Sequence, residues 1–324
     1  MKTVAILGGL GSQMTKYAFY LDVKKKCQNE CCYIDTTPFH TLQMWNGYEL
    51  NRIFGIKEQD LCDLYSEQEK KQFEDVPYKK IAMKKMHDME PDRALYCTNR
   101  GKVIKYGTEQ NIGVRLKGKV QSIINQYWFA KVMHDDRHID KYPSEYLSID
   151  GNIYYDEFNH TSDFYFKDAA EEIRQAFIFP QFEDEKNKNI SKEMLETESV
   201  ALHVRRSDHM YDNIALFERN YFKKSVDLIR QNAENLKFYV FSEETDWCST
   251  HLEELGISNA DDVCFIDWNH GEESYRDMQL MTYCKHNILA ISSFSWWGCY
   301  LSVNREDKIA CAPNGYWFDV KNHF

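Results

Sequence analysis

The residues best suited to chemistry stand in one stretch, Ser199–Asp208, where the apolar run Val200–Val204 ends in Arg205, Arg206 and Asp208. An apolar run of this length predicts a buried strand. At the carboxyl end of a strand in an α/β sheet, side chains face the crevice where such sheets bind ligands. A guanidinium has a planar fork of donors that suits a phosphate. Taken alone, the stretch is either a clamp for a phosphorylated leaving group or a strand that ends in surface salt bridges.

A second polar cluster follows the predicted strand Ile288–Ile291, in the run Ser292–Gly298 that precedes a helix. Serine hydroxyls and the first amides of a helix can both donate to a phosphate. The alternative is an ordinary N-cap followed by core aromatics. Asp277 begins the predicted helix Ser274–Cys284, and its carboxylate could accept hydrogen bonds from a guanine edge. It could equally be a first-turn acid favoured by the helix dipole.

The chain opens with a βαβ pattern. Val4–Leu7 predicts a strand, Gly8–Gly11 a tight turn, Ser12–Lys26 a helix, and a second strand ends at Asp35. A glycine turn at a helix amino end can bind an anion, and this one partly matches a dinucleotide fingerprint. The third glycine of that fingerprint is replaced by Met14. A ligand cradle, an NAD-dependent oxidoreductase and a purely structural turn all remain open at this point.

The rest of the chain predicts two α/β domains, divided by the polar stretch Glu183–Lys192, which has no apolar period and is expected to be a linker. Before it we expect exposed helices over 57–93, strand pieces at Tyr96, Val103–Tyr106 and Val114–Val120, a hairpin or loop region over Ser122–Tyr155, and a helix over Asp168–Phe179. After it, strands at Val200–Val204, Phe238–Phe241 and Val263–Ile266 alternate with helices at Asn220–Asn235 and Cys248–Leu255. This alternation is typical of a parallel sheet covered by helices on both faces.

Bulk composition limits the classes of protein. A length of 324 residues fits two domains, and a net charge of -11 argues against a nucleic-acid-binding surface. No secretory signal or membrane span is visible, and ten scattered cysteines without a C-x-x-C pair indicate reduced thiols. We therefore expect a cytoplasmic protein. Its lysine-rich segment leaves open a peripheral position at the inner face of the membrane.

Several motifs together resemble the bacterial α-1,2-fucosyltransferase family. His203-Val-Arg-Arg-Ser-Asp208 is similar to the H-x-R-R-x-D motif of α-1,2- and α-1,6-fucosyltransferases, and Phe238-Tyr-Val-Phe-Ser242 to their second motif. The third motif is similar to the segments Asp267–Asn269, Asp277–Met281 and Ser293–Gly298. Gly8-Gly-Leu-Gly-Ser-Gln13 resembles the amino-terminal G-G-L-G-N-Q of the bacterial members.

The resemblance implies a GT-B-like glycosyltransferase with two Rossmann-like domains facing a cleft, 1–182 on the acceptor side with an insertion near 122–148, and 183–324 binding GDP-fucose. It implies transfer of L-fucose with inversion to the 2-hydroxyl of a galactoside in a surface polysaccharide or lipid-linked glycan, with α-1,6 transfer as the alternative. Arg205, Arg206 and Asp208 are the expected catalytic residues. The expected donor-binding residues are Gly9, Gly11, Ser12, Gln13, His203, Arg205, Arg206, Ser242, Asp277, Ser293, Phe294 and Ser295.

No metal or other cofactor is expected, because the chain has no D-x-D and the paired arginines could neutralise the leaving diphosphate instead. Arg206→Lys is accordingly expected to lose most activity. The general base is open between Asp208, His209 and Asp212, since an aspartate beside two arginines is held ionised and is a poor base. Departures from the family pattern flank the expected acceptor side, at Ser12, Thr15-Lys16, Phe158–Thr161 and Ile291. The identity of the acceptor is therefore the inference that transfers least from the family.

Overall fold

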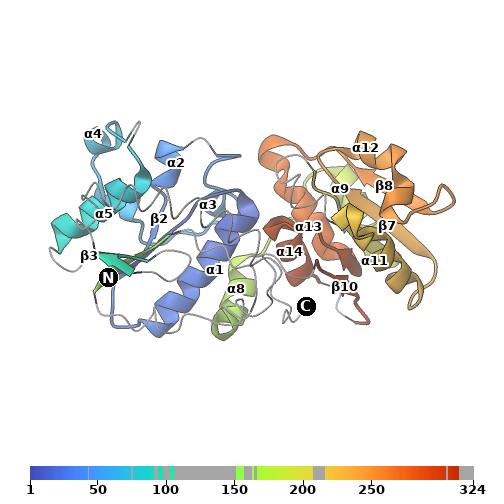
Figure 1. The fold of residues 1–324 in the computed structure, drawn as a ribbon, viewed down its shortest axis with the longest axis horizontal. Coiled ribbons are helices and arrows are strands. Elements are labelled where there is room, and N and C mark those ends of the chain that lie inside the picture. The colour runs from blue at the N-terminus through green and yellow to red at the C-terminus, as the bar shows by residue number, and fades with distance from the viewer. Residues whose placement is uncertain are drawn as a thin grey trace. The chain divides into compact units, whose positions relative to one another are not determined.

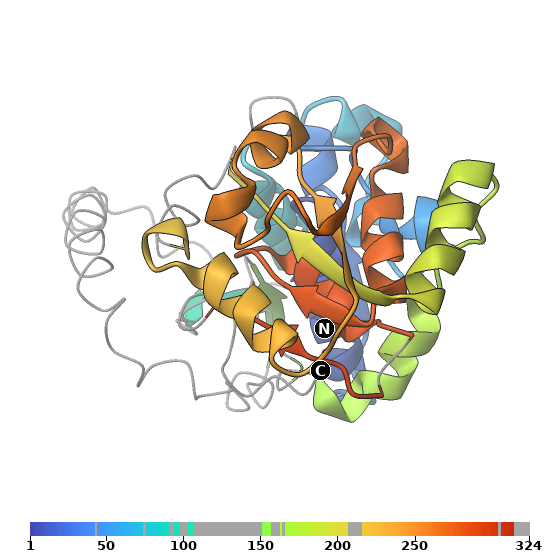
Figure 2. The same cartoon turned by 90° about the vertical axis from the view of Figure 1, so that its right-hand side faces the viewer.

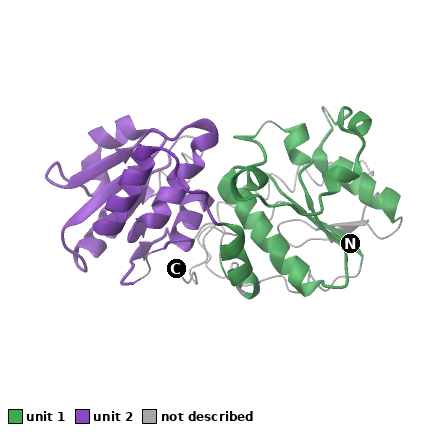
Figure 3. Cartoon of the chain, turned by 180° about the vertical axis from the view of Figure 1, so that it is seen from behind, with its two compact units in different colours: residues 1–177, 319–322 green, residues 178–318, 323–324 purple. Residues whose placement is uncertain are grey.

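The computed structural model describes residues 1–42, 44–73, 76–90, 94–97, 103–105, 151–156, 163, 166–206, 216–303 and 306–313. The chain forms two compact units, the first running from Met1 to Phe177 and the second beginning at Ile178 (Figure 3). The division expected from the sequence lies after residue 182. Each unit is built on a mostly parallel sheet with helices, so the predicted α/β class is confirmed.

The first sheet has the strand order β2-β1-β5-β3-β4, and only β4 is antiparallel to its neighbour (Figure 1). Its strands are β1 (Lys2–Ala5), β2 (Cys32–Asp35), β3 (Ala94–Cys97), β4 (Val103–Lys105) and β5 (Asn152–Tyr155). Its helices are α1 (Leu10–Lys26), α2 (Pro38–Thr41), α3 (Leu50–Phe54), α4 (Glu67–Lys70), α5 (Tyr78–Met89) and α8 (Ala170–Ala176), with 3-10 turns at Leu61–Leu64 and Lys167–Ala169.

Two expectations for this unit are wrong. Asn152–Tyr155, assigned to a hairpin or loop region, is the middle strand β5, and every one of its residues is buried. A four-residue strand covered on both faces has no alternation for a sequence pattern to reveal. The charged region 57–93 is also not fully exposed, because α5 buries Tyr78, Ile81 and Met86 behind its lysine pairs.

The second sheet has the order β10-β9-β6-β7-β8, with all strands parallel. Its strands are β6 (Glu198–His203), β7 (Leu236–Phe241), β8 (Asp262–Ile266), β9 (His286–Ile288) and β10 (Ala310–Cys311). Its helices are α9 (Glu185–Glu196), α11 (Tyr221–Arg230), α12 (Thr245–Thr250), α13 (Tyr275–Tyr283) and α14 (Ser293–Tyr300), with 3-10 turns at Leu252–Leu255 and Gly271–Glu273. Helix α11 covers one face of the sheet, and α9 and α13 cover the other (Figure 2).

The predicted linker Glu183–Lys192 is wrong, since most of it belongs to α9. Asp184 caps this helix by accepting a 2.7 Å hydrogen bond from the Asn187 amide. Only a narrow apolar stripe, Ile190 and the fully buried Met194, packs on the core of the unit. So few apolar positions among charged ones do not produce a visible helical period.

The end of the second unit also differs from expectation, because the strand is β9, His286–Ile288, rather than Ile288–Ile291, and α14 begins at Ser293. The Ser-Phe-Ser-Trp-Trp-Gly motif is therefore the first part of α14 rather than a turn before it. Trp296 and Trp297 are fully buried core residues. A Cβ on Gly298 would stand 2.7 Å from the Met281 Cβ, so this glycine lets α14 approach α13 closely.

In the residues that the structure describes, no helix is both long enough and apolar enough to cross a bilayer. The described cysteines are free thiols, and most of them are buried. Burial raises the pKa of Cys248 to about 11, so this thiol stays protonated and unreactive at neutral pH.

Candidate functional site

The second sheet reverses its strand order between the central strand β6 and its neighbour β9. From β6 the chain proceeds to β7 on one side, and the later strands β9 and β10 lie on the other. In α/β sheets such a reversal opens a crevice at the carboxyl ends of the two strands, where ligands bind. The residues that follow β6 are Val204–Arg206, and those that follow β9 lead to Ser292.

A hydrogen bond joins the two sides of this crevice. Arg205 Nη1 donates to Ser292 Oγ over 3.0 Å. The same hydroxyl oxygen accepts the Phe294 amide N–H over 3.2 Å and so caps α14. A guanidinium and the positive end of a helix are thereby held together, and both favour a bound anion. This arrangement can hold a phosphate group at the switch point of the sheet.

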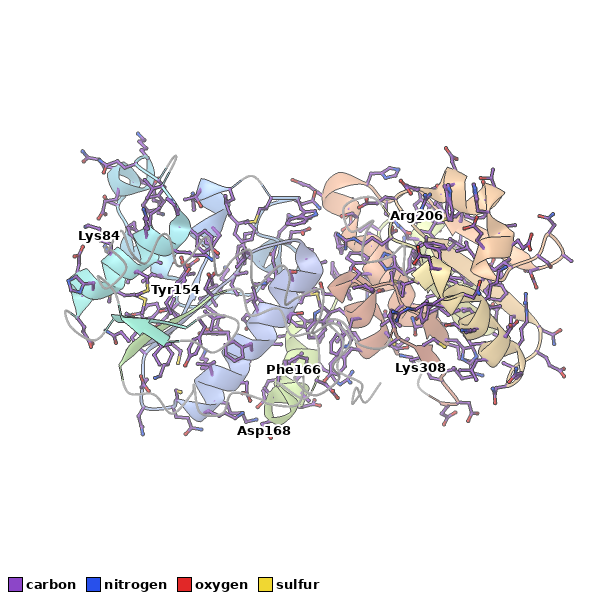
Figure 4. The ribbon with its side chains drawn as sticks, in the orientation of Figure 1. Lys84, Tyr154, Phe166, Asp168, Arg206 and Lys308 are labelled. Atoms are coloured by element: carbon purple, nitrogen blue, oxygen red, sulfur yellow. The ribbon has the colours of Figure 1, made fainter. Side chains whose placement is uncertain are left out.

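Arg206 faces a different set of neighbours. Its Nη1 lies 3.2 Å from Glu244 Oε2, and its guanidinium carbon lies 3.7 Å from the centre of the Trp247 ring. Figure 4 labels Arg206 in the second unit, beside the elements that carry these partners. Stacking on an indole fixes the plane of a guanidinium. Adjacent arginines are therefore held apart, with Arg205 at α14 and Arg206 at α12.

Asp277 lies in the first turn of α13, at the same edge of the sheet, because helices that connect parallel strands run antiparallel to them. Asn269, after β8, donates from Nδ2 to Asp277 Oδ1 over 2.8 Å. The pKa of Asp277 is raised to about 7, chiefly by burial and to a smaller extent by the charge of Asp267, while the Asn269 hydrogen bond acts to lower it. The carboxylate is thus an acceptor whose charge changes near neutral pH.

The remaining expected donor residues of this unit take distinct positions. The His203 and Phe294 rings lie near each other, with centroids 6.1 Å apart. Ser242 Oγ accepts the Glu244 amide N–H, and Ser295 is buried with its hydroxyl donating to the Ser292 carbonyl. The hydroxyls of Ser242 and Ser295 therefore hold backbone, while Ser293 is half-buried at the start of α14.

The glycine turn of the first unit holds a neighbouring loop. Gln13 is fully buried; its Nε2 donates to the carbonyls of Gly8 and Gly47 over 2.9 and 2.8 Å, and its Oε1 accepts the Glu49 amide. These three bonds position the loop that carries Trp45, whose side chain is 65% exposed. A Cβ on Gly9 would contact the Trp45 ring at 3.5 Å.

Gly11 lies within α1, and Ser12 is half-buried there. Gly8 has φ +90°, and a Cβ there would stand 2.8 Å from Ser12 Cβ. The turn therefore requires glycine at position 8 for backbone reasons alone. The donor-binding role expected for Gly9, Gly11, Ser12 and Gln13 stays a prediction.

The oxidoreductase alternative depends on Asp35 holding a ribose. Asp35 is fully buried, and its carboxylate accepts hydrogen bonds from the Thr37 amide over 3.0 Å and from Tyr154 Oη over 2.7 Å (Figure 4 labels Tyr154). Burial raises its pKa to about 6. A carboxylate with no exposed surface cannot reach a ribose hydroxyl, so the geometry does not support this alternative.

A family model, "Glycosyl transferase family 11", matches residues 112–317. The chain belongs to this family. The resemblance stated from the motifs is thus confirmed at the level of the family, and the match covers both the H-x-R-R-x-D stretch and the helix α14 motif.

Named relatives of family 11 also match. An Escherichia coli alpha-1,2-colitosyltransferase is 36% identical over 160 residues, which are 48% of this chain and 53% of that protein. The Escherichia coli O-antigen biosynthesis glycosyltransferase WbnK is 31% identical over 38% of this chain and 40% of its own. The chain thus spans about half the length of the first relative and less of the second. Among solved structures, fucosyltransferase NodZ from Bradyrhizobium covers 92% of this chain and 91% of its own at 11% identity, with a TM-score of 0.48.

Ser292 was readable from the sequence, because a serine directly before a helical motif is a common N-cap. Sequence reasoning missed three other partners of this site, Glu244, Trp247 and Asn269. They meet Arg206 and Asp277 through tertiary packing, which local spacing does not encode. Asp208, His209 and Asp212, the insertion 122–148 and Phe158–Thr161 lie outside the described residues.

Proposed function

We propose that this protein transfers L-fucose from GDP-fucose to the 2-hydroxyl of a galactoside in a surface glycan, with inversion and without a metal. Membership of glycosyl transferase family 11 and the names of the matched relatives support an α-1,2 glycosyl transfer. The observation that carries the proposal is the bond between Arg205 and the N-cap Ser292 at the switch point of the second sheet.

On the donor side, the diphosphate binds between Arg205, Arg206 and the first turn of α14. Guanine binds at Asp277, and His203 and Phe294 flank the nucleoside. As the acceptor oxygen attacks C1 of fucose, the bond from C1 to the phosphate oxygen breaks, and that oxygen gains negative charge. Cationic donors fixed at this position stabilise the charge as it develops. Asp208 is assigned to orient a guanidinium, and the acceptor proton leaves to a base that is not assigned.

On the acceptor side, the exposed ring of Trp45 beside Gly9 offers an apolar face to a sugar. Aromatic faces suit the C–H surface of a pyranose, and burial of that surface is favourable. Galactose is the expected accepting sugar because relatives are named galactoside alpha-(1,2)-fucosyltransferases, such as the rat protein at 30% identity over 32% of this chain.

A second candidate donor comes from the 36% identical colitosyltransferase. Colitose lacks the 3-hydroxyl of fucose, so the two donors share the GDP moiety and the transferred C1. The proposed phosphate and guanine contacts fit both, and the donor sugar must be distinguished by assay.

The test is incubation of the purified protein with GDP-fucose or GDP-colitose and a panel of β-galactosides, with EDTA present, followed by linkage analysis of the product. Among the described residues, no group of three or more His, Cys, Asp or Glu side chains is arranged to hold a metal, and metal independence itself stays a prediction until this assay. Transfer that stops with EDTA and resumes with manganese would contradict the arginine clamp. An α-1,6 product would replace the proposed linkage.

A further inference from the structure

A chain of side-chain hydrogen bonds lies behind Asp277 and joins three separate elements. Asn269 follows β8, Asn187 lies on α9, and Asp184 caps α9. Asn269 Nδ2 donates to Asp277 Oδ1 over 2.8 Å, Asn187 Nδ2 donates to Asn269 Oδ1 over 2.8 Å, and the same Nδ2 donates to Asp184 Oδ2 over 3.0 Å. Both asparagines are buried, at 8% and 2% exposure.

The orientation of both amides is fixed by partners of one hydrogen-bonding kind. Trp268 Nε1, which can only donate, donates to Asn187 Oδ1 over 2.9 Å. The carboxylates of Asp184 and Asp277 mainly accept, so the amide nitrogens must face them. Rotation of either amide by 180° would place donor against donor and oxygen against carboxylate inside a buried site. The hydrogen-bonded network therefore has one arrangement in which every donor meets an acceptor. This arrangement determines which oxygen of Asp277 accepts the Asn269 amide.

The network orients Asp277 without adding a positive charge. Of the charged groups near this carboxylate, Asp267 is an acid, and so is Asp184 at the far end of the amide chain. Arg276, the adjacent cation on α13, bonds to the Pro180 carbonyl over 3.0 Å and to Gln279 over 2.9 Å. An acceptor held by amides keeps more of its negative charge available to a ligand than one paired with a guanidinium.

We propose that Asn269 and Asn187 are positioning residues that hold the Asp277 carboxylate in line with the two neighbouring N–H donors of a guanine base, and so determine selectivity for guanine nucleotides. The proposal rests on the proposed function, which places the donor nucleotide in this crevice. Guanine presents its ring N1–H and its 2-amino group side by side, and a carboxylate accepts both only when its plane matches theirs. Hypoxanthine has the first donor and lacks the second, so it reports on alignment.

The test compares the Kd of GDP with that of IDP for the full-length protein and its variants. The wild type is expected to bind GDP at least ~10-fold more tightly than IDP, as a bidentate base contact allows. Asn269→Leu removes the amide at nearly constant volume. It should lower the ratio of the IDP Kd to the GDP Kd to about 3 or less, with GDP affinity falling more than IDP affinity. Trp268→Phe, which removes the indole N–H together with the five-membered ring, should lower the ratio by a smaller factor.

The matched control is Asn232→Ala, since Asn232 is an exposed asparagine of the same unit whose amide bonds to the Leu228 carbonyl. It should leave the ratio unchanged. Asp277→Asn should abolish the preference for GDP and shows that the nucleotide site is correctly located. A merely structural role for Asn269 would weaken GDP and IDP equally, and this result in Asn269→Leu and Trp268→Phe overturns the proposal while the proposed function stands. A wild type that does not prefer GDP to IDP overturns this proposal and the placement of guanine at Asp277, whereas the proposed transfer is overturned only by its own product assay.

Discussion

Replacing Arg205 by lysine separates the two properties that the clamp requires, positive charge and a planar fork of donors. Lysine keeps the charge but cannot reach Ser292 Oγ and a phosphate with fixed parallel donors. The loss is about one charge-assisted hydrogen bond, on the order of 1.5–3 kcal/mol. If this bond strengthens in the transition state, kcat/KM for GDP-fucose should fall roughly 10- to 150-fold.

Arg205→Ala removes the charge as well. A unit-charge contact at about 4 Å and an effective dielectric of 20 is worth about 4 kcal/mol. The kcat/KM of the alanine variant should therefore be about a thousandfold lower than that of the wild type, and well below that of the lysine variant. Arg206→Lys should also lose most activity, in its case with loss of the stacking on Trp247.

The assay is GDP release at saturating acceptor, with the Kd of GDP measured in parallel. Arg230→Lys is the control, because Arg230 is an exposed arginine of the same unit that pairs with Asp261. It should keep near-normal kcat/KM. The reasoning is refuted if Arg205→Lys keeps activity within about threefold of the wild type, since that would mean the fork makes no contact that the reaction uses.

Three further predictions follow from single contacts. The affinity for GDP should rise as the pH passes through about 7 and level off above it, because the pKa of Asp277 is about 7 and only its ionised form accepts both guanine donors; isothermal titration between pH 5.5 and 8.5 measures this. Gly298→Ala should destabilise the protein by about 1–3 kcal/mol in urea unfolding, because the new methyl overlaps Met281, and an unchanged free energy of unfolding would show that the helices can separate freely. Trp45→Ala should raise the KM for the acceptor several-fold with little change in the Kd of GDP, and a change confined to GDP would move this ring to the donor side.

The second unit was largely predictable from sequence, because its strands are continuous apolar runs and its helices have caps or clear apolar faces. Strands β6, β7 and β8 lie within a few residues of their predicted positions. The errors share one physical cause. Helix α9 and strand β5 depend on burial against distant segments, at Met194 and across β1 and β3, and a window of neighbouring residues does not contain that information.

The candidate site divides in the same way. Arg205, Asp277 and the serines of α14 could be predicted because strand ends and helix starts are readable in sequence, and a parallel sheet brings these ends to one edge. The direction in which each side chain points could not. Arg205 and Arg206 are adjacent and chemically identical, yet one bonds to Ser292 and the other stacks on Trp247, and both partners come from segments distant in the sequence.

Gly298 links the helix packing of the second unit to the geometry of the candidate site. The proposed nucleotide site needs the first turns of α13 and α14 together, because Asp277 lies on one helix and the N-cap Ser292 precedes the other. The two helices can approach this closely because residue 298 is glycine. A Cβ added there would stand 2.7 Å from the Met281 Cβ. A larger residue at the crossing would push the helices apart, and a shift of about 1 Å at a reacting centre can cost on the order of a hundredfold in rate. If the proposed function holds, the motif glycine and its buried tryptophans affect catalysis without contacting substrate, because they hold Asp277 and the start of α14 at one fixed spacing.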